Sequence, residues 1–152
     1  YNQQYMDKNP NAAPTDFMKL AEIYVNKAKK DPAKKIENID KAIGVYAKLS
    51  EKYPTLKTFA KLQEGNTAFQ NELDDKAIAA YTEVINELEA KQCDEDELSY
   101  LKTSYQYMGF IYTYDKQDFN TAKPYWDKLL KLDPQNKLAN DAYEKAGLKP
   151  GE

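Results

Sequence analysis

The sequence contains no histidine, and all 22 of its basic side chains are lysine, so arginine is absent as well. Without histidine, the usual general acid or base at neutral pH is missing. Ser-His-Asp triads, Cys-His pairs and His-ligated metal sites are therefore excluded. Without arginine, no planar guanidinium can hold a carboxylate or phosphate at two points. We expect a protein that is not an enzyme, with no catalytic residue, no metal and no cofactor.

Cysteine and long apolar runs are also scarce. Cys93 is the single cysteine, which excludes an internal disulfide and any cysteine-rich metal site. The acids at 94–97 lack the Asp-x-Asp-x-Asp-Gly loop of calcium sites and favour a helix start instead. No stretch approaches the ~18 apolar residues that a membrane helix requires, so we expect no membrane insertion.

The remaining composition indicates one folded, helical domain. A length of 152 residues suits a single domain, and 41% hydrophobic with 31% charged residues argues against disorder. The net charge of −3 argues against a general partner among nucleic acids or anionic membranes.

Apolar residues recur at steps of three and four, which predicts amphipathic helices and no strand. Asp31-Pro32 and Pro54 mark helix starts, and Gly147 marks the last helix end. The predicted helices span 15–29, 32–52, 56–71, 74–92, 96–115, 119–132 and 136–146. Residues 1–14, rich in Asn and Pro, are expected to form a flexible lead-in outside the core. The domain is then expected to cover 15–148.

The helices come in similar pairs. A small residue is followed four residues later by an aromatic one at Ala42 and Tyr46, at Ala77 and Tyr81, and at Ala122 and Trp126. The third pair adds further packing positions on its first helix, and a Pro closes it: Tyr105, Met108, Gly109, Tyr112 and Pro134.

This pattern resembles the tetratricopeptide repeat, a helix–turn–helix unit of ~34 residues. The expected repeats span about 15–54, 58–91 and 102–136, and 136–146 resembles the helix that caps such arrays. The resemblance implies an all-α, right-handed superhelical stack of helix pairs. It also implies a concave groove, lined by the first helix of each pair, that binds a peptide or helix of a partner protein.

The expected groove residues lie on the first helices of the second and third pairs: Leu62, Asn66, Phe69, Gln106, Tyr107, Phe110 and Tyr114. Met18, Glu22 and Val25 hold the corresponding positions in the first pair. Aromatic side chains outside the core favour binding, although the terminal helix or the lead-in could instead cover them. A carboxylate clamp around Asn66 is incomplete, because Leu62, Gln106 and Phe110 stand where cationic or Asn groups are needed.

The function expected from this resemblance is non-catalytic protein interaction, as an adaptor. The alternative is a self-associating scaffold without a separate ligand, and light scattering distinguishes the two because a scaffold must be oligomeric. An enzyme with paired carboxylates is disfavoured, because Glu22 is the single acid at a predicted groove position. The chain starts at Tyr1 rather than Met. That start favours an exported, periplasmic bacterial chain over a cytoplasmic one, although the sequence could equally be a piece of a longer protein. The oligomeric state stays open.

Overall fold

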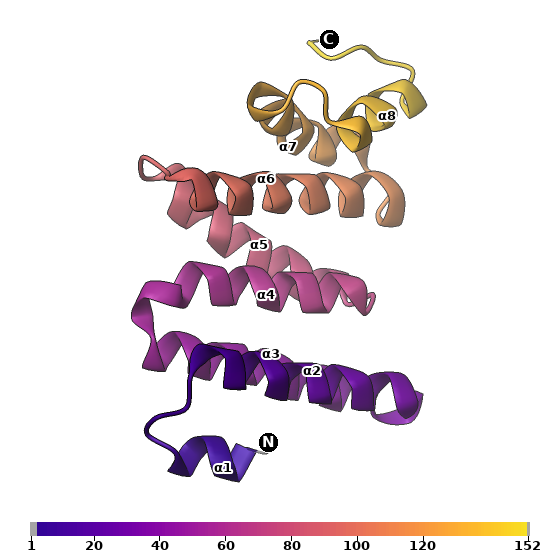
Figure 1. The fold of residues 1–152 in the computed structure, drawn as a ribbon. Helices are drawn as coiled ribbons and strands as arrows, with labels where there is room; N and C mark the ends of the chain where they lie inside the picture. The colour runs from indigo at the N-terminus through magenta and orange to yellow at the C-terminus, as the bar shows by residue number, and fades with distance from the viewer. Residues whose placement is uncertain (1–2, 152) are drawn as a thin grey trace. The chain divides into compact units, whose positions relative to one another are not determined.

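The computed structural model describes residues 3–151, and over this range it contains helices and no β-strand, which confirms the all-α prediction (Figure 1). The α-helices are α1 (Gln3–Lys8), α2 (Pro14–Lys30), α3 (Lys35–Lys52), α4 (Lys57–Gln70), α5 (Asp74–Glu89), α6 (Glu95–Phe110), α7 (Phe119–Leu132) and α8 (Lys137–Lys145). Short 3₁₀ turns, η1 (Pro32–Lys34) and η2 (Pro54–Leu56), precede α3 and α4, and a π-helical turn, η3 (Ile111–Asp115), extends α6.

The proline and capping signals place most helix ends where the sequence predicts them. Pro32 and Pro54 each begin a 3₁₀ turn, because proline has no N–H to lose in the first turn of a helix. α7 has the predicted bounds, although Pro124 lies inside it. α5 ends at Glu89, three residues before the predicted end at 92.

The lead-in differs from its prediction. It contains α1, and Met6 and Ala12 are buried in the same hydrophobic cluster as Phe17 and Leu20. The Tyr53 hydroxyl donates a hydrogen bond of 2.7 Å to the carbonyl oxygen of Ala12, which holds this segment against the start of η2. The prediction that the lead-in lies outside the core was therefore wrong for residues 3–14, whereas residues 1 and 2 of that prediction lie outside the described residues. Burying these two apolar side chains outweighs the polar composition around them.

The chain divides into two compact units, residues 1–80 and 81–152, with the boundary inside α5. The single domain expected over 15–148 stays a prediction. In the first unit, α3 packs against both α2 and α4, and the three helices lie side by side in Figure 1. Their shared core includes Leu20, Ala42, Leu49 and Ala60, none more than 1% exposed.

In the second unit, α6 packs against α7 and α8. Trp126 of α7 is fully buried, and its indole Nε1 donates a 2.8 Å hydrogen bond to Thr113 Oγ1 in η3. α8 is fixed by Tyr143, which is 1% exposed, packs edge-on against Phe119 and donates a hydrogen bond to Asp127.

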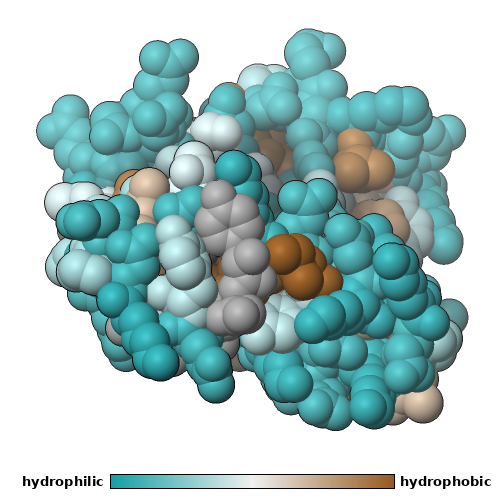
Figure 2. Space-filling view, turned by 60° about the horizontal axis from the view of Figure 1, so that its bottom comes forward, coloured by the Kyte–Doolittle hydropathy of each residue, from teal (hydrophilic) through white to brown (hydrophobic). Residues whose placement is uncertain are grey.

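Large hydrophobic side chains are seldom exposed. The exposed ones among the described residues are Tyr5, Met18, Ile36, Leu132 and Leu148. Figure 2 shows a face on which hydrophilic side chains predominate and hydrophobic ones form small separate patches. We therefore expect a binding site in a groove with both polar and apolar side chains rather than on a broad apolar patch.

Candidate functional site: a groove between two helices of the first unit

The first unit contains a groove of about 520 Å³ between α2 and α4. The lining residues come from three helices of that unit: Thr15, Met18, Lys19, Glu22, Val25, Asn26 and Lys29 of α2, Tyr46 of α3, and Gln63, Asn66, Thr67 and Gln70 of α4.

The groove face of α2 follows from helical spacing. Its lining residues recur at steps of three and four between Thr15 and Lys29, which places them along one side of the helix. The opposite side carries Phe17, Leu20 and Ala21, which are buried in the core. Since α-helices rise 1.5 Å per residue, this lined face is about 21 Å long. An extended chain of about six residues spans that length.

Tyr46 joins the core to the groove. It is 8% exposed and belongs to the hydrophobic cluster, yet it also lines the groove. Burial, followed by the negative charge of Glu22, raises the pKa of the Tyr46 phenol. The phenol therefore stays neutral at physiological pH and keeps its proton as a hydrogen-bond donor.

Carboxamides make up much of the polar lining, with Asn26 on α2 and Gln63, Asn66 and Gln70 on α4. Each carboxamide can donate and accept, which matches the alternating N–H and C=O groups of an extended peptide backbone. Lysine and glutamate add charges of both signs, and Met18 and Val25 add apolar surface. The groove can therefore hold a polypeptide segment, with apolar contacts beside backbone hydrogen bonds.

The structure brings together four of the groove positions expected in the first unit, Met18, Glu22, Val25 and Asn66. It places Leu62 differently. Leu62 is 5% exposed and is buried on the side of α4 that also carries the buried Gly65, three residues later. Phe69 is half-buried and does not line the groove.

Sequence reasoning missed the carboxamides Asn26, Gln63 and Gln70 and the floor residue Tyr46. Gln63 and Gln70 lie three before and four after Asn66, so the helical period from Asn66 could have identified them. The sequence pattern predicts only a packing role for Tyr46, because its access to the groove depends on how closely α2 and α4 approach.

In the second unit, the expected groove residues lie on α6 and η3. The rings of Phe110 and Tyr114 are 4.8 Å apart between centroids, which confirms that this pair of aromatic side chains is adjacent. The Tyr107 ring lies 5.9 Å from the ring of the buried Tyr81. The side chains of Tyr107, Phe110 and Tyr114 are half-buried, whereas that of Tyr81 is buried.

Gln106 and Tyr114 contact the C-terminal helix segment. Asn136 donates from Nδ2 to Gln106 Oε1 over 3.1 Å, and Asn136 also caps the N-terminus of α8. The Lys145 ammonium lies 4.7 Å from the Tyr114 ring centroid. The end of α8 therefore borders Tyr114, and the Phe110 ring packs on the Tyr114 ring.

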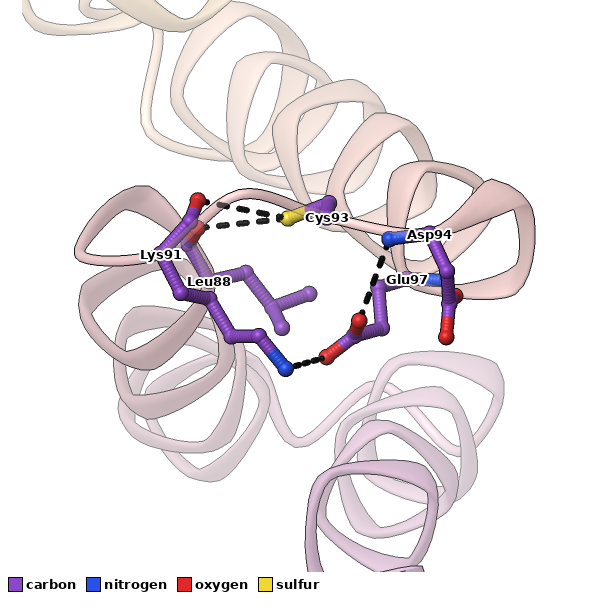
Figure 3. A network of polar contacts seen from close by, with 5 residues as sticks. All are labelled: Leu88, Lys91, Cys93, Asp94 and Glu97. Atoms are coloured by element: carbon purple, nitrogen blue, oxygen red, sulfur yellow. Dashed lines mark hydrogen bonds and ion pairs between the residues drawn. The ribbon is translucent and has the colours of Figure 1, made fainter.

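The acidic run after Cys93 forms a helix start (Figure 3). The Asp94 side chain accepts from the Glu97 N–H over 2.8 Å, and Glu97 accepts in return from the Asp94 N–H, which is a capping box. Lys91 donates to the second Glu97 oxygen over 2.5 Å. The Cys93 thiol donates to the Leu88 carbonyl over 3.3 Å, and burial and then the Glu97 charge raise the pKa of the thiol.

Neither a membrane span nor a metal cluster is found in residues 3–151. No helix in that range combines the length and the apolar character needed to cross a bilayer. The same residues gather no group of three or more cysteine, aspartate or glutamate side chains that could hold a metal ion. No protein-family model matches the chain, and neither a curated protein nor a solved structure matches it.

Proposed function

We propose that this chain is a non-catalytic protein-interaction module that binds an extended segment of a partner protein in the α2–α4 groove. The observation that carries the proposal is the shared lining of that groove. Met18, Glu22 and Val25 of α2 face the same groove as Asn66 of α4, above the floor residue Tyr46. Apolar surface and backbone-matching carboxamides thus occur along one continuous face.

The proposal includes a tetratricopeptide-like architecture of helix pairs in a right-handed superhelical stack. The pairs α2–α3 and α6–α7 support it, because in each the two helices pack against each other. The small residues at the expected close approaches, Ala42, Ala77 and Ala122, have no exposed surface. Such packing of helix pairs leaves the first helix of each pair to line a groove.

A random peptide library displayed on phage provides the test, because it samples many sequences without a chosen partner. Peptides selected on the wild-type chain are synthesised, and their affinities are measured by fluorescence anisotropy. Met18→Ala removes apolar groove surface and Asn66→Ala removes a groove carboxamide. We expect each to weaken binding about tenfold, which corresponds to the loss of about 1.4 kcal/mol.

Two variants outside the groove serve as matched controls. Ile36→Ala removes an apolar side chain that is 59% exposed, and Gln92→Ala removes an exposed carboxamide. Neither should change the affinity. Failure to select any peptide, or equal losses in groove and control variants, would contradict the proposal. If the chain instead scatters light as a stable oligomer and selects no peptide, the self-associating scaffold becomes the better explanation.

A further inference from the structure

A cavity of about 330 Å³ lies in the second unit, between η3, the start of α7 and the end of α8. Its apolar walls are the rings of Tyr114 and Phe119 and the methyl groups of Ala142 and Ala146. This volume falls within the range of small-molecule sites in proteins, at its lower end. The cavity is distinct from the α2–α4 groove.

The two aromatic walls are held by their neighbours. Phe119 packs edge-on against the buried Tyr143, with ring centroids 5.3 Å apart. Tyr114 packs on Phe110 at 4.8 Å. A ligand ring entering the cavity would therefore meet surfaces that are already ordered, which limits the entropy lost on binding.

The polar groups of the cavity include the ammonium of Lys145, and no carboxylate lines it. The Lys145 ammonium lies 4.7 Å from the Tyr114 ring centroid. Within residues 3–151, Lys145 has no ion-pair partner, whereas Lys137 on the same helix pairs with Asp141 over 2.5 Å. A cation beside an apolar cavity, without a protein carboxylate, favours an anion as the ligand.

Thr113 adds a hydroxyl group to the residues that line the cavity. Thr113 lines the cavity and is 9% exposed, and its Oγ1 already accepts from Trp126 Nε1 over 2.8 Å. A threonine hydroxyl has one donor proton in addition to its lone pairs. Because its oxygen accepts from the indole, the hydroxyl proton is the group that Thr113 offers to a ligand. Gln117 adds a carboxamide to the lining.

We propose that this cavity binds a small aromatic carboxylate, with its ring between Tyr114 and Phe119 and its carboxylate at Lys145. The apolar walls account for the ring, and the lysine and threonine donors account for the anion. The proposal does not depend on partner binding in the groove, since the two sites share no residue.

Phenylacetate is the probe, titrated into the full chain labelled with ¹⁵N and followed by amide chemical shifts. 2-Phenylethanol and 2-phenylethylamine are the neutral and cationic controls of similar shape. We expect saturable shifts at Tyr114, Gln117 and Lys145, and an affinity for phenylacetate about tenfold higher than for either control. Equal affinities for the three compounds, or shifts that do not saturate at these residues, would overturn the proposal.

Substitutions then test whether Lys145 binds the carboxylate of phenylacetate. Lys145→Gln should weaken phenylacetate binding about tenfold, while Lys131→Gln, an equal charge change at an exposed position on α7, should leave it unchanged. Ala146→Leu places a larger side chain at an exposed edge of the cavity and should abolish binding. Helical circular dichroism verifies that each variant is folded. Wild-type affinity in both Lys145→Gln and Ala146→Leu would overturn the assignment.

Discussion

A β-carbon on Gly109 would lie 2.6 Å from two ring carbons of Trp126. The backbone of α6 therefore approaches the face of the indole as closely as a glycine allows. The indole cannot move away easily, because Trp126 is fully buried and its nitrogen donates to Thr113. This contact fixes the distance between α6 and α7.

Gly109→Ala should therefore destabilise the protein, by about 1–3 kcal/mol for an overpacked core contact. Gly44→Ala is the matched control, because Gly44 lies inside α3 and a β-carbon added there would have nothing within 4 Å. There the substitution should stabilise by about 0.5–1 kcal/mol through helix propensity. Urea unfolding measures the change in the free energy of unfolding for both variants. Equal effects of the same sign would show that the indole does not exclude a side chain at position 109.

Removing α8 should expose apolar surface of the second unit to solvent. Ala139, Ala142 and Tyr143 of α8 are at most 1% exposed, so they cover apolar surface on their neighbours. Deleting residues 137–152 should lower the melting temperature or cause aggregation. Scanning calorimetry and light scattering check this, and a truncated chain that stays monomeric with an unchanged melting temperature would contradict the capping role.

The Phe110–Tyr114 pair should affect binding more than stability. Both rings are half-buried, so the double substitution to alanine should cost clearly less than the ~3–5 kcal/mol of a buried Phe→Ala change. Phe17→Ala, at a position that is 4% exposed, is the buried control. We expect the double variant to retain its helical circular dichroism and to lose phenylacetate binding in the cavity that Tyr114 lines. Destabilisation as large as that of Phe17→Ala would assign the pair to the core.

Protonation of Glu89 at low pH should reduce the stability of the second unit. Partial burial opposes its ionisation, but hydrogen bonds from Lys128 and Tyr105, with the Lys128 charge, lower the pKa of this carboxyl below its usual 4.5. A group with a lowered folded-state pKa stabilises the fold above its unfolded pKa, and this contribution is lost as the pH falls through the folded value. Stability should therefore fall below about pH 4.5.

Glu89→Gln should flatten that acid dependence, whereas Glu87→Gln, an exposed position on the same helix, should leave it intact. Urea unfolding between pH 3 and pH 7 (a range of about four units around the carboxyl pKa) makes the comparison. An unchanged acid dependence in Glu89→Gln would show that other carboxyls dominate.

Helix positions were predictable because periodicity and proline punctuation are local signals. The step of four between Phe110 and Tyr114 also predicted their contact, since such residues are neighbours on any helix. Met6 was missed because a short helix depends on what it packs against. Its neighbours Asn9 and Pro10 indicate a loop, while its burial comes from the core beneath it.

The candidate site was predictable only in part. The groove positions Met18 and Asn66 follow from helical spacing, but the burial of Leu62 depends on how α4 packs against its neighbours in three dimensions. The π-helical turn at 111–115 likewise has no local signal in the sequence. The turn contains Thr113, whose hydroxyl oxygen accepts a hydrogen bond from the indole of Trp126, a contact between residues 13 positions apart.

Trp126 is the one tryptophan of the sequence, and it lies in the second of the two compact units. Its fluorescence therefore reports the folding of residues 81–152, whereas helical circular dichroism reports both units. α5 carries residues of both units in one uninterrupted helix, so opening either unit frays a helix that the other needs. The fluorescence and dichroism curves in denaturant should then coincide. Comparing the two curves therefore tests whether the two units unfold in one cooperative transition.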